Sequence, residues 1–167
     1  KYARDWALAR NSAYTSFSSD CTNFVSQALR TGGFRNTATT AVYGSQYWYY
    51  STSSKYSNTW VNAHALYTRF DSGYENWVKW NGMESVNYGD IVFADWDADN
   101  KVDHSMIVTG FKKRSDGLLD PVFSYHSTDR LDFPRSSVYN LGGSSAKYYR
   151  FGPSGQCLVV TKNQIVP

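Results

Sequence analysis

Apolar side chains recur at helical spacing in three segments of the first half of the chain. In residues 2–17 an apolar or aromatic side chain returns about once per helical turn, which predicts a first helix. Residues 21–31 carry a second apolar face, and the Gly32-Gly33 pair after it predicts where that helix ends. The apolar stripe of residues 60–70 predicts a third helix.

The second half of the chain has a different pattern, with short runs rich in β-branched and aromatic residues. Five such runs predict strands at residues 90–96, 105–111, 121–127, 147–151 and 157–161. Helices followed by consecutive strands predict an α+β fold with an antiparallel sheet. No repeat or linker divides the chain, so we expect a single domain over residues 1–167.

Composition narrows the classes of partner. The chain has 17 basic and 14 acidic residues, and a net charge of +3 without basic clusters argues against nucleic acid. No apolar run approaches the roughly 18 residues of a membrane span. The chain begins at Lys1 rather than at a methionine, which we interpret as a mature or excised segment without its signal peptide. The 14 Tyr, 6 Trp and 9 Phe residues in a polar chain are typical of secreted proteins that contact polymers.

Cys21 follows Asp20 directly, at the expected start of the second helix. Asp is a preferred N-cap residue, so Cys21 would lie in the first turn, where free N–H groups and the helix dipole favour a thiolate. Two other interpretations remain open from the residues alone. Cys21 is either a small buried hydrophobic residue or one half of a disulfide with Cys157, the second cysteine of the chain.

A nucleophilic cysteine needs a histidine base and a third group that orients the base. The chain has three histidines. His104 opens one expected strand and His126 ends the next, so both could face the start of the second helix. His64 lies within the third expected helix, near its polar edge, and is interpreted as an ordinary surface residue.

Four motifs in chain order carry a resemblance to a known family. They are DCTNFVSQAL at residues 20–29, YGDIVFADW at 88–96, DHSMIVTG at 103–110 and YHSTDR at 125–130. Together they resemble the putative amidase domain family, over residues 2–151. That family is similar to NlpC cell-wall peptidases and CHAP domains, so the resemblance implies a papain-like fold with N-terminal helices packed on a small antiparallel sheet. It also implies that Cys21 is the nucleophile, His104 the base and His126 the residue that orients the base.

The same resemblance implies a function. It points to a cysteine amidase or peptidase that hydrolyses an amide bond in bacterial peptidoglycan, as a monomeric domain of a larger secreted protein, extracellular or associated with the cell wall. Two alternatives remain, namely acyl transfer to an amine on the same site and a non-catalytic cell-wall binding module. The chemistry requires no cofactor. The backbone N–H of Cys21 and the side chain of Tyr14 are candidate oxyanion donors.

Residues 95–105, DWDADNKVDHS, begin like a calcium-binding loop. The candidate ligands are Asp95, Asp97, Asp99 and Asp103. Asn100 stands where such loops turn, but Met106 replaces the bidentate glutamate expected at position twelve, so a complete EF-hand is excluded. The sequence therefore predicts either a weak structural calcium site or a solvated acidic turn.

Two further segments are expected near the site. Residues 127–138 are interpreted as a surface loop in which Asp129, Arg130 and Arg135 either pair with one another or bind a substrate carboxylate. The aromatic segment 42–50 is expected to form one wall of the cleft, with about half of its rings in the core.

Overall fold

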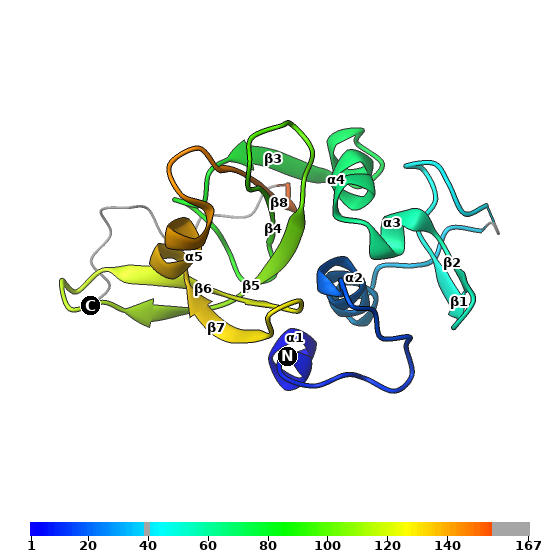
Figure 1. Ribbon diagram of the computed structural model, residues 1–167, viewed down its shortest axis with the longest axis horizontal. Helices are drawn as coiled ribbons and strands as arrows, with labels where there is room; N and C mark the ends of the chain where they lie inside the picture. Colours follow the sequence, from blue (N-terminus) through cyan, green and yellow to red (C-terminus); the bar gives the residue numbers. More distant parts are fainter. Residues whose placement is uncertain (39–40, 155–167) are drawn as a thin grey trace.

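The computed structural model describes residues 1–38 and 41–154, and its centre is a six-stranded antiparallel sheet with the strand order β3-β8-β4-β5-β6-β7 (Figure 1). The strands of this sheet are β3 (Trp77–Asn81), β4 (Ile91–Asp95), β5 (His104–Lys113), β6 (Leu119–Tyr125), β7 (Arg130–Pro134) and β8 (Lys147–Pro153). A separate two-stranded hairpin is formed by β1 (Tyr50–Thr52) and β2 (Lys55–Tyr56).

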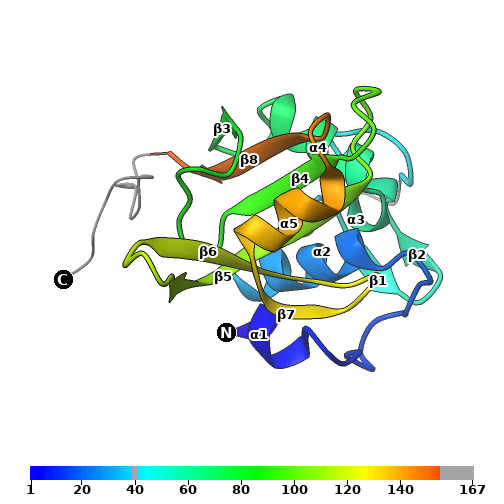
Figure 2. The ribbon, with the colours of Figure 1, turned by 60° about the vertical axis from the view of Figure 1, so that its left-hand side comes forward.

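Helices pack on both faces of the large sheet. They are α1 (Tyr2–Trp6), α2 (Cys21–Thr31), α3 (Asn58–Val61), α4 (Ala63–Asp71) and α5 (Arg135–Gly142). The buried residues of α1, α2, α3 and α4 belong to one apolar cluster, and α5 packs into the other, so the sheet is the middle layer (Figure 2). None of the helices in the described ranges is both long enough and apolar enough to cross a membrane.

Strand β4 shows why the sheet occupies this position. Its five residues are all buried, and their side chains alternate between the two apolar clusters. Ile91 and Phe93 pack towards α2 and α4, while Val92 and Ala94 pack towards α5. An uninterrupted apolar run is typical of a strand covered on both faces, and this run was readable from the sequence.

The antiparallel α+β fold predicted from the sequence is confirmed. Helix α2 has the expected bounds, and Gly33 after it adopts a φ of 105°, a conformation that strongly favours glycine. Strands β4, β5, β6 and β8 occupy the segments in which strands were expected. The fifth expected strand, at residues 157–161, lies outside the described residues.

Two helix predictions were too long. The first helix ends at Trp6 instead of residue 17, and the side-chain oxygen of Asn11 accepts the backbone N–H of Ala13 in the segment expected to be helical. Such local side-chain bonds compete with helical ones. The third helix is divided into α3 and α4 at Asn62, which is extended and accepts the N–H of Ala65 with its side chain.

Other elements were missed. Residues 127–138, expected to be a surface loop, contain strand β7 and the start of α5. Strand β7 is the edge of the large sheet and pairs only with β6 there, and α5 buries few apolar side chains. Strand β3, at the opposite edge, pairs with β8. Strand β3 lacks the alternating apolar pattern that a sequence search relies on, and β7 has it over only five residues, with two apolar side chains.

Candidate active site

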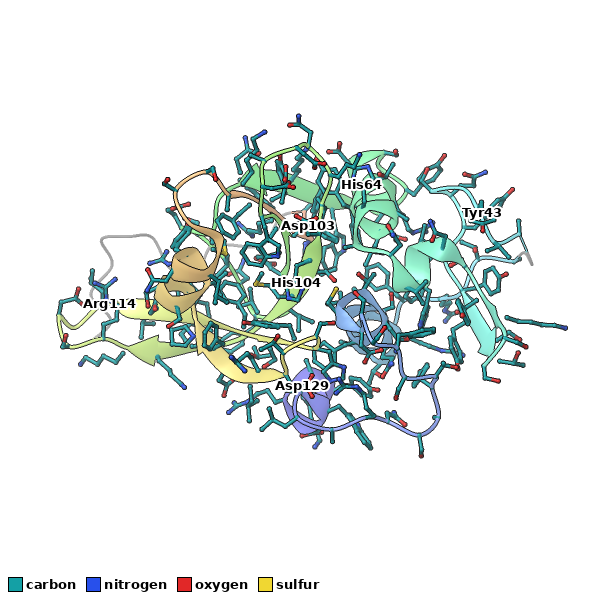
Figure 3. All side chains as sticks on the ribbon, in the orientation of Figure 1. Tyr43, His64, Asp103, His104, Arg114 and Asp129 are labelled. Carbon is teal, nitrogen blue, oxygen red and sulfur yellow. The ribbon has the colours of Figure 1, made fainter. Side chains whose placement is uncertain are left out.

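The first turn of α2 meets the start of β5, and this junction contains Cys21 and His104. Cys21 is free and only 3% exposed, and His104 is 8% exposed. Thr22 follows Cys21 in α2, and Ser105 follows His104 in β5. The hydroxyls of Thr22 and Ser105, both fully buried, lie 3.1 Å apart and join the two elements. Figure 3 shows His104 in the interior, where the sheet approaches α2. The structure therefore brings together the expected nucleophile and the expected base.

The environment of Cys21 lowers the pKa of its thiol. Burial raises its pKa, but a hydrogen bond and positive charge from His104, the Thr22 hydroxyl 3.6 Å from the sulfur, and the backbone of Ser105 lower it by more. The net result is a pKa of about 7, below that of an ordinary cysteine. A substantial fraction of Cys21 is consequently thiolate at neutral pH, which an inert buried cysteine would not be.

Aromatic side chains hold the His104 ring. Tyr125 meets it edge-on, with ring centroids 4.8 Å apart, and Trp96 lies at 5.9 Å. The ring atom Nε2 is buried and has no hydrogen-bond partner among the described residues. The third group expected to orient His104 through a hydrogen bond is thus not found in the described part of the chain.

His126 does not orient His104, and this part of the prediction is wrong. Its Nδ1 lies 2.6 Å from Oδ2 of Asp20 and its Nε2 lies 2.9 Å from the carbonyl oxygen of Trp6. A carbonyl oxygen only accepts, so Nε2 of His126 donates to Trp6. The ring is 1% exposed and packs 4.2 Å from the Phe24 ring, on the helical side of the sheet.

His126 contacts Asp20 instead of His104. The sequence predicted that Asp20 precedes helix α2, but not that its carboxylate binds His126. Asp20 is the N-cap residue of α2, yet its carboxylate does not bind the helix N–H groups. The carboxylate, completely buried, has four hydrogen-bond or ion-pair partners: His126, Arg10 at 3.1 Å, the Asn23 amide at 2.8 Å and the Phe17 N–H at 3.1 Å. These contacts fix the segment before α2 to the end of β6 and leave the N–H groups of the first turn available.

A cavity of about 290 Å³ opens beside His104. It is lined by Trp96, His104, Tyr125, Ser127, Thr128, Arg130 and Leu141. Ser127 and Thr128 both have positive φ angles, 63° and 76°, a strained conformation that is frequent at functional sites. Cys21 lines neither this cavity nor a larger one of about 420 Å³, but His104 lines only the smaller one, which is therefore the candidate substrate site.

The other side chains expected near the site have different positions. Asp129 forms a two-point ion pair with Arg10, at 2.8 and 2.9 Å, and this hydrogen bonding holds the pKa of Asp129 below its usual value. Arg135 is buried against Asp120, so of the predicted trio only Arg130 reaches the cavity.

The aromatic segment 42–50 forms no wall of the cavity. Trp48 and Tyr50 are buried in the core beside α2, and the Trp48 indole donates to Ser26. Tyr43 is 78% exposed and projects from the far end of the molecule, well away from His104 (Figure 3). The candidate oxyanion donor Tyr14 also packs in this aromatic group, against Tyr50 and Trp60.

The acidic loop between β4 and β5 brings three of the four predicted metal ligands together. Asp95, Asp97 and Asp99 each offer an oxygen, and these atoms lie within 4.8 Å of one another. Asp103 is not part of this group, because its Oδ2 accepts the backbone N–H of Trp96 at 2.8 Å. His64 is more than a surface residue, since its Nδ1 accepts the N–H of Val102 in the same loop.

Comparisons with known proteins identify relatives of the chain. Residues 1–151 match the family described as "Putative amidase domain". Two proteins of Bacillus subtilis (strain 168) are similar. Uncharacterized protein YjcM is 33% identical over 153 residues, which cover 86% of this chain and 33% of that protein. Uncharacterized protein YhbB is 31% identical over 122 residues, which cover 72% and 38%.

These matches set the scope of the comparison. The chain spans between 33% and 38% of the length of these two relatives, so each relative has a large part that this chain does not match. No solved structure matches the chain. A papain-like fold therefore stays a prediction, whereas the α+β architecture is observed in the structure.

Proposed function

The chain belongs to the putative amidase domain family, and from this premise we propose that it is a cysteine-dependent amidase that cleaves an amide bond of bacterial peptidoglycan. One observation carries the proposal: a buried Cys21 thiol with a pKa of about 7 lies at a helix start beside His104. Family membership supports amide hydrolysis. Peptidoglycan as the substrate, and an extracellular location, follow from the resemblance to NlpC and CHAP proteins.

The proposed reaction is acyl transfer through a thioester. The Cys21 thiolate attacks the amide carbonyl carbon, and the resulting oxyanion accepts hydrogen bonds from N–H groups of the first turn of α2. The carbon–nitrogen bond then breaks while His104 gives its proton to the leaving amine. His104 next takes a proton from water, and the hydroxide releases the acid and restores the thiolate.

His126 and Asp20 are proposed to act as positioning residues. The buried Asp20 carboxylate joins His126, Arg10 and α2, so it determines where the helix begins and where the Cys21 sulfur lies. The backbone N–H of Asp20 also donates to the Ser127 hydroxyl at 2.7 Å, which links the helix start to the rim of the cavity. Neither residue needs to touch the substrate in this scheme.

The cavity beside His104 is the proposed binding site for the peptide. Trp96 and Tyr125 offer aromatic faces, and the guanidinium of Arg130 offers a positive charge suited to a peptide carboxylate. Leu141 on α5, 61% exposed, forms an apolar rim. Ser127 and Thr128, which lie between strands β6 and β7, also line the cavity beside His104.

We predict that alkylation of Cys21 by iodoacetamide follows a titration with a midpoint near pH 7. The thiolate is the reactive form, so the rate should rise as pH increases through the pKa and then level off. The measurement uses a Cys157→Ser variant, so that only Cys21 reacts, and mass spectrometry of the adduct between pH 5 and pH 10. The same variant unfolded in denaturant is the control, with a midpoint at about 8.5. A midpoint in the folded protein equal to that of the unfolded control would show that the Cys21 thiol is not activated.

The proposed function is tested by digestion of purified peptidoglycan. We expect soluble fragments in which each cleaved amide has gained one water, as identified by mass spectrometry, and no fragments after Cys21 has been alkylated. Fragments joined to an added amine in place of water would show the transferase alternative. Tight sedimentation with peptidoglycan, without any cleavage, would instead support the binding-module alternative and overturn the proposal.

A further inference from the structure

The β4–β5 loop gathers negative charge in one place. The three clustered oxygens of Asp95, Asp97 and Asp99 lie within 4.8 Å of one another. Calcium binds oxygens at 2.3–2.6 Å, so two ligands of one ion are separated by at most about 5 Å. Three oxygens at this spacing fit around a single ion.

Asp95 supplies an independent reason to expect a cation. Its side chain is completely buried, and its Oδ1 has no hydrogen-bond partner in the part of the chain that the structure describes. Its Oδ2 accepts the N–H of Asn100 at 3.0 Å. A buried carboxylate oxygen without a partner is costly, and native proteins rarely leave one. Asp90 and Asp120 also have an Oδ1 without a hydrogen bond, but each carboxylate is paired with an arginine, and Asp95 has no such ion pair among the described residues.

We propose that Asp95, Asp97 and Asp99 bind a calcium ion in the β4–β5 loop. All three ligands are hard carboxylate oxygens, which favours calcium over transition metals that prefer nitrogen or sulfur. The loop lacks a bidentate glutamate, because position twelve is Met106, near the start of β5. Binding is accordingly weak, in the range of about 10⁻⁴–10⁻³ M that is typical of extracellular calcium modules.

Two lysines are close to this site without neutralising it. The ammonium of Lys147 donates to the carbonyl oxygen of Ala98 at 3.3 Å and to the Asn100 side chain at 2.8 Å, so these hydrogen bonds are directed at the loop and not at the three carboxylates. Lys101 is 75% exposed and lies 3.8 Å from Asp99, a separation at which a solvated pair contributes little. The buried Asp95 oxygen therefore needs a closer positive charge.

The position of the loop connects the ion to the proposed active site. Trp96, next to Asp95, and His104, next to Asp103, both line the cavity. Hydrogen bonds from Trp96 to Asp103 and from Val102 to His64 hold the loop between these two residues. An ion at Asp95 would stabilise the loop and hold both cavity residues in place.

A thermal unfolding experiment tests the site without relying on activity. Calcium added to chelator-treated protein should raise the Tm by about 5 °C or more at a hundredfold excess over Kd. Asp97→Ala should abolish this shift, and Asp97→Asn, which keeps an oxygen for the turn, should reduce it. Asp116→Asn is the matched control, because Asp116 lies in another exposed turn, paired with Arg114, and should leave the shift unchanged.

Terbium luminescence gives a second measurement. Tb³⁺ replaces calcium at oxygen sites and emits when a nearby tryptophan is excited, and Trp96 adjoins the ligand Asp95. We expect emission that calcium displaces in the unmodified protein and in Asp116→Asn, and none in Asp97→Ala. A calcium shift of equal size in Asp97→Ala, or the absence of both the shift and the displaceable emission, would overturn the proposal.

Discussion

Replacement of Cys21 by alanine is expected to abolish amide hydrolysis and to leave the fold intact. Without the sulfur no thioester forms, and loss of the nucleophile of a catalytic unit costs on the order of a millionfold in rate. The structural cost is small, because alanine suits the first turn of α2 and the sulfur gives up only hydrogen bonds with His104, Thr22 and Ser105, not packing volume. The measurements are fragment release from peptidoglycan and the Tm.

Two further variants make this test specific. Cys21→Ser preserves the shape of the side chain, but a hydroxyl does not ionise at neutral pH, so this variant should also be inactive. Cys157→Ser is the matched cysteine control and should keep full activity. Hydrolysis that persists in purified Cys21→Ala protein would show that Cys21 is not the nucleophile.

Local sequence signals were sufficient for the elements that carry Cys21 and His104. Helix α2 has an N-cap residue, an apolar face and a glycine stop, all within the segment itself. Strands β4 and β5 are buried on both faces over most of their length, and each contains a short apolar run, IVFA in β4 and MIV in β5. Since Cys21 begins one of these elements and His104 begins another, the positions of both could be predicted from the sequence.

The elements that were missed depend on contacts made elsewhere in the chain. Strand β7 has charged residues and is stabilised by pairing with β6, which a local pattern does not reveal. Helix α5 buries chiefly Val138 and Arg135, and the ion pair between Arg135 and Asp120 joins segments far apart in the sequence. Asp20 is a comparable case in the site, because the arginine and histidine that contact it come from two other segments.

The role of His126 was misjudged because of the alternation of side chains along a strand. The motif placed His126 at the end of β6 but did not indicate which face of the sheet it would occupy. Neighbouring residues in a strand point to opposite faces. Tyr125 lies on the face of His104 and meets its ring, so His126 points the other way, towards Phe24 of α2 and Trp6 of α1.

This geometry predicts different consequences for the loss of each histidine. His104→Ala should reduce hydrolysis by on the order of a thousandfold or more, because both the leaving amine and the attacking water lose their proton carrier. It should also raise the midpoint of Cys21 alkylation from about 7 towards the free value of about 8.5. The Tm should fall moderately, because the buried ring loses its packing against Tyr125 and Trp96, but no buried carboxylate loses a partner.

His126→Ala should instead act chiefly on stability. It removes two buried hydrogen bonds and leaves the Asp20 carboxylate without its 2.6 Å partner, a change that costs about 3 kcal/mol or more. The expected fall in Tm is about 5–15 °C, with hydrolysis reduced in part because α2 is less well positioned. His126→Gln, which can donate one of the two bonds, should recover part of both losses. A His126→Ala protein that kept its Tm but lost all hydrolysis would show that His126 acts directly in the reaction, and the positioning role through Asp20 would have to be abandoned.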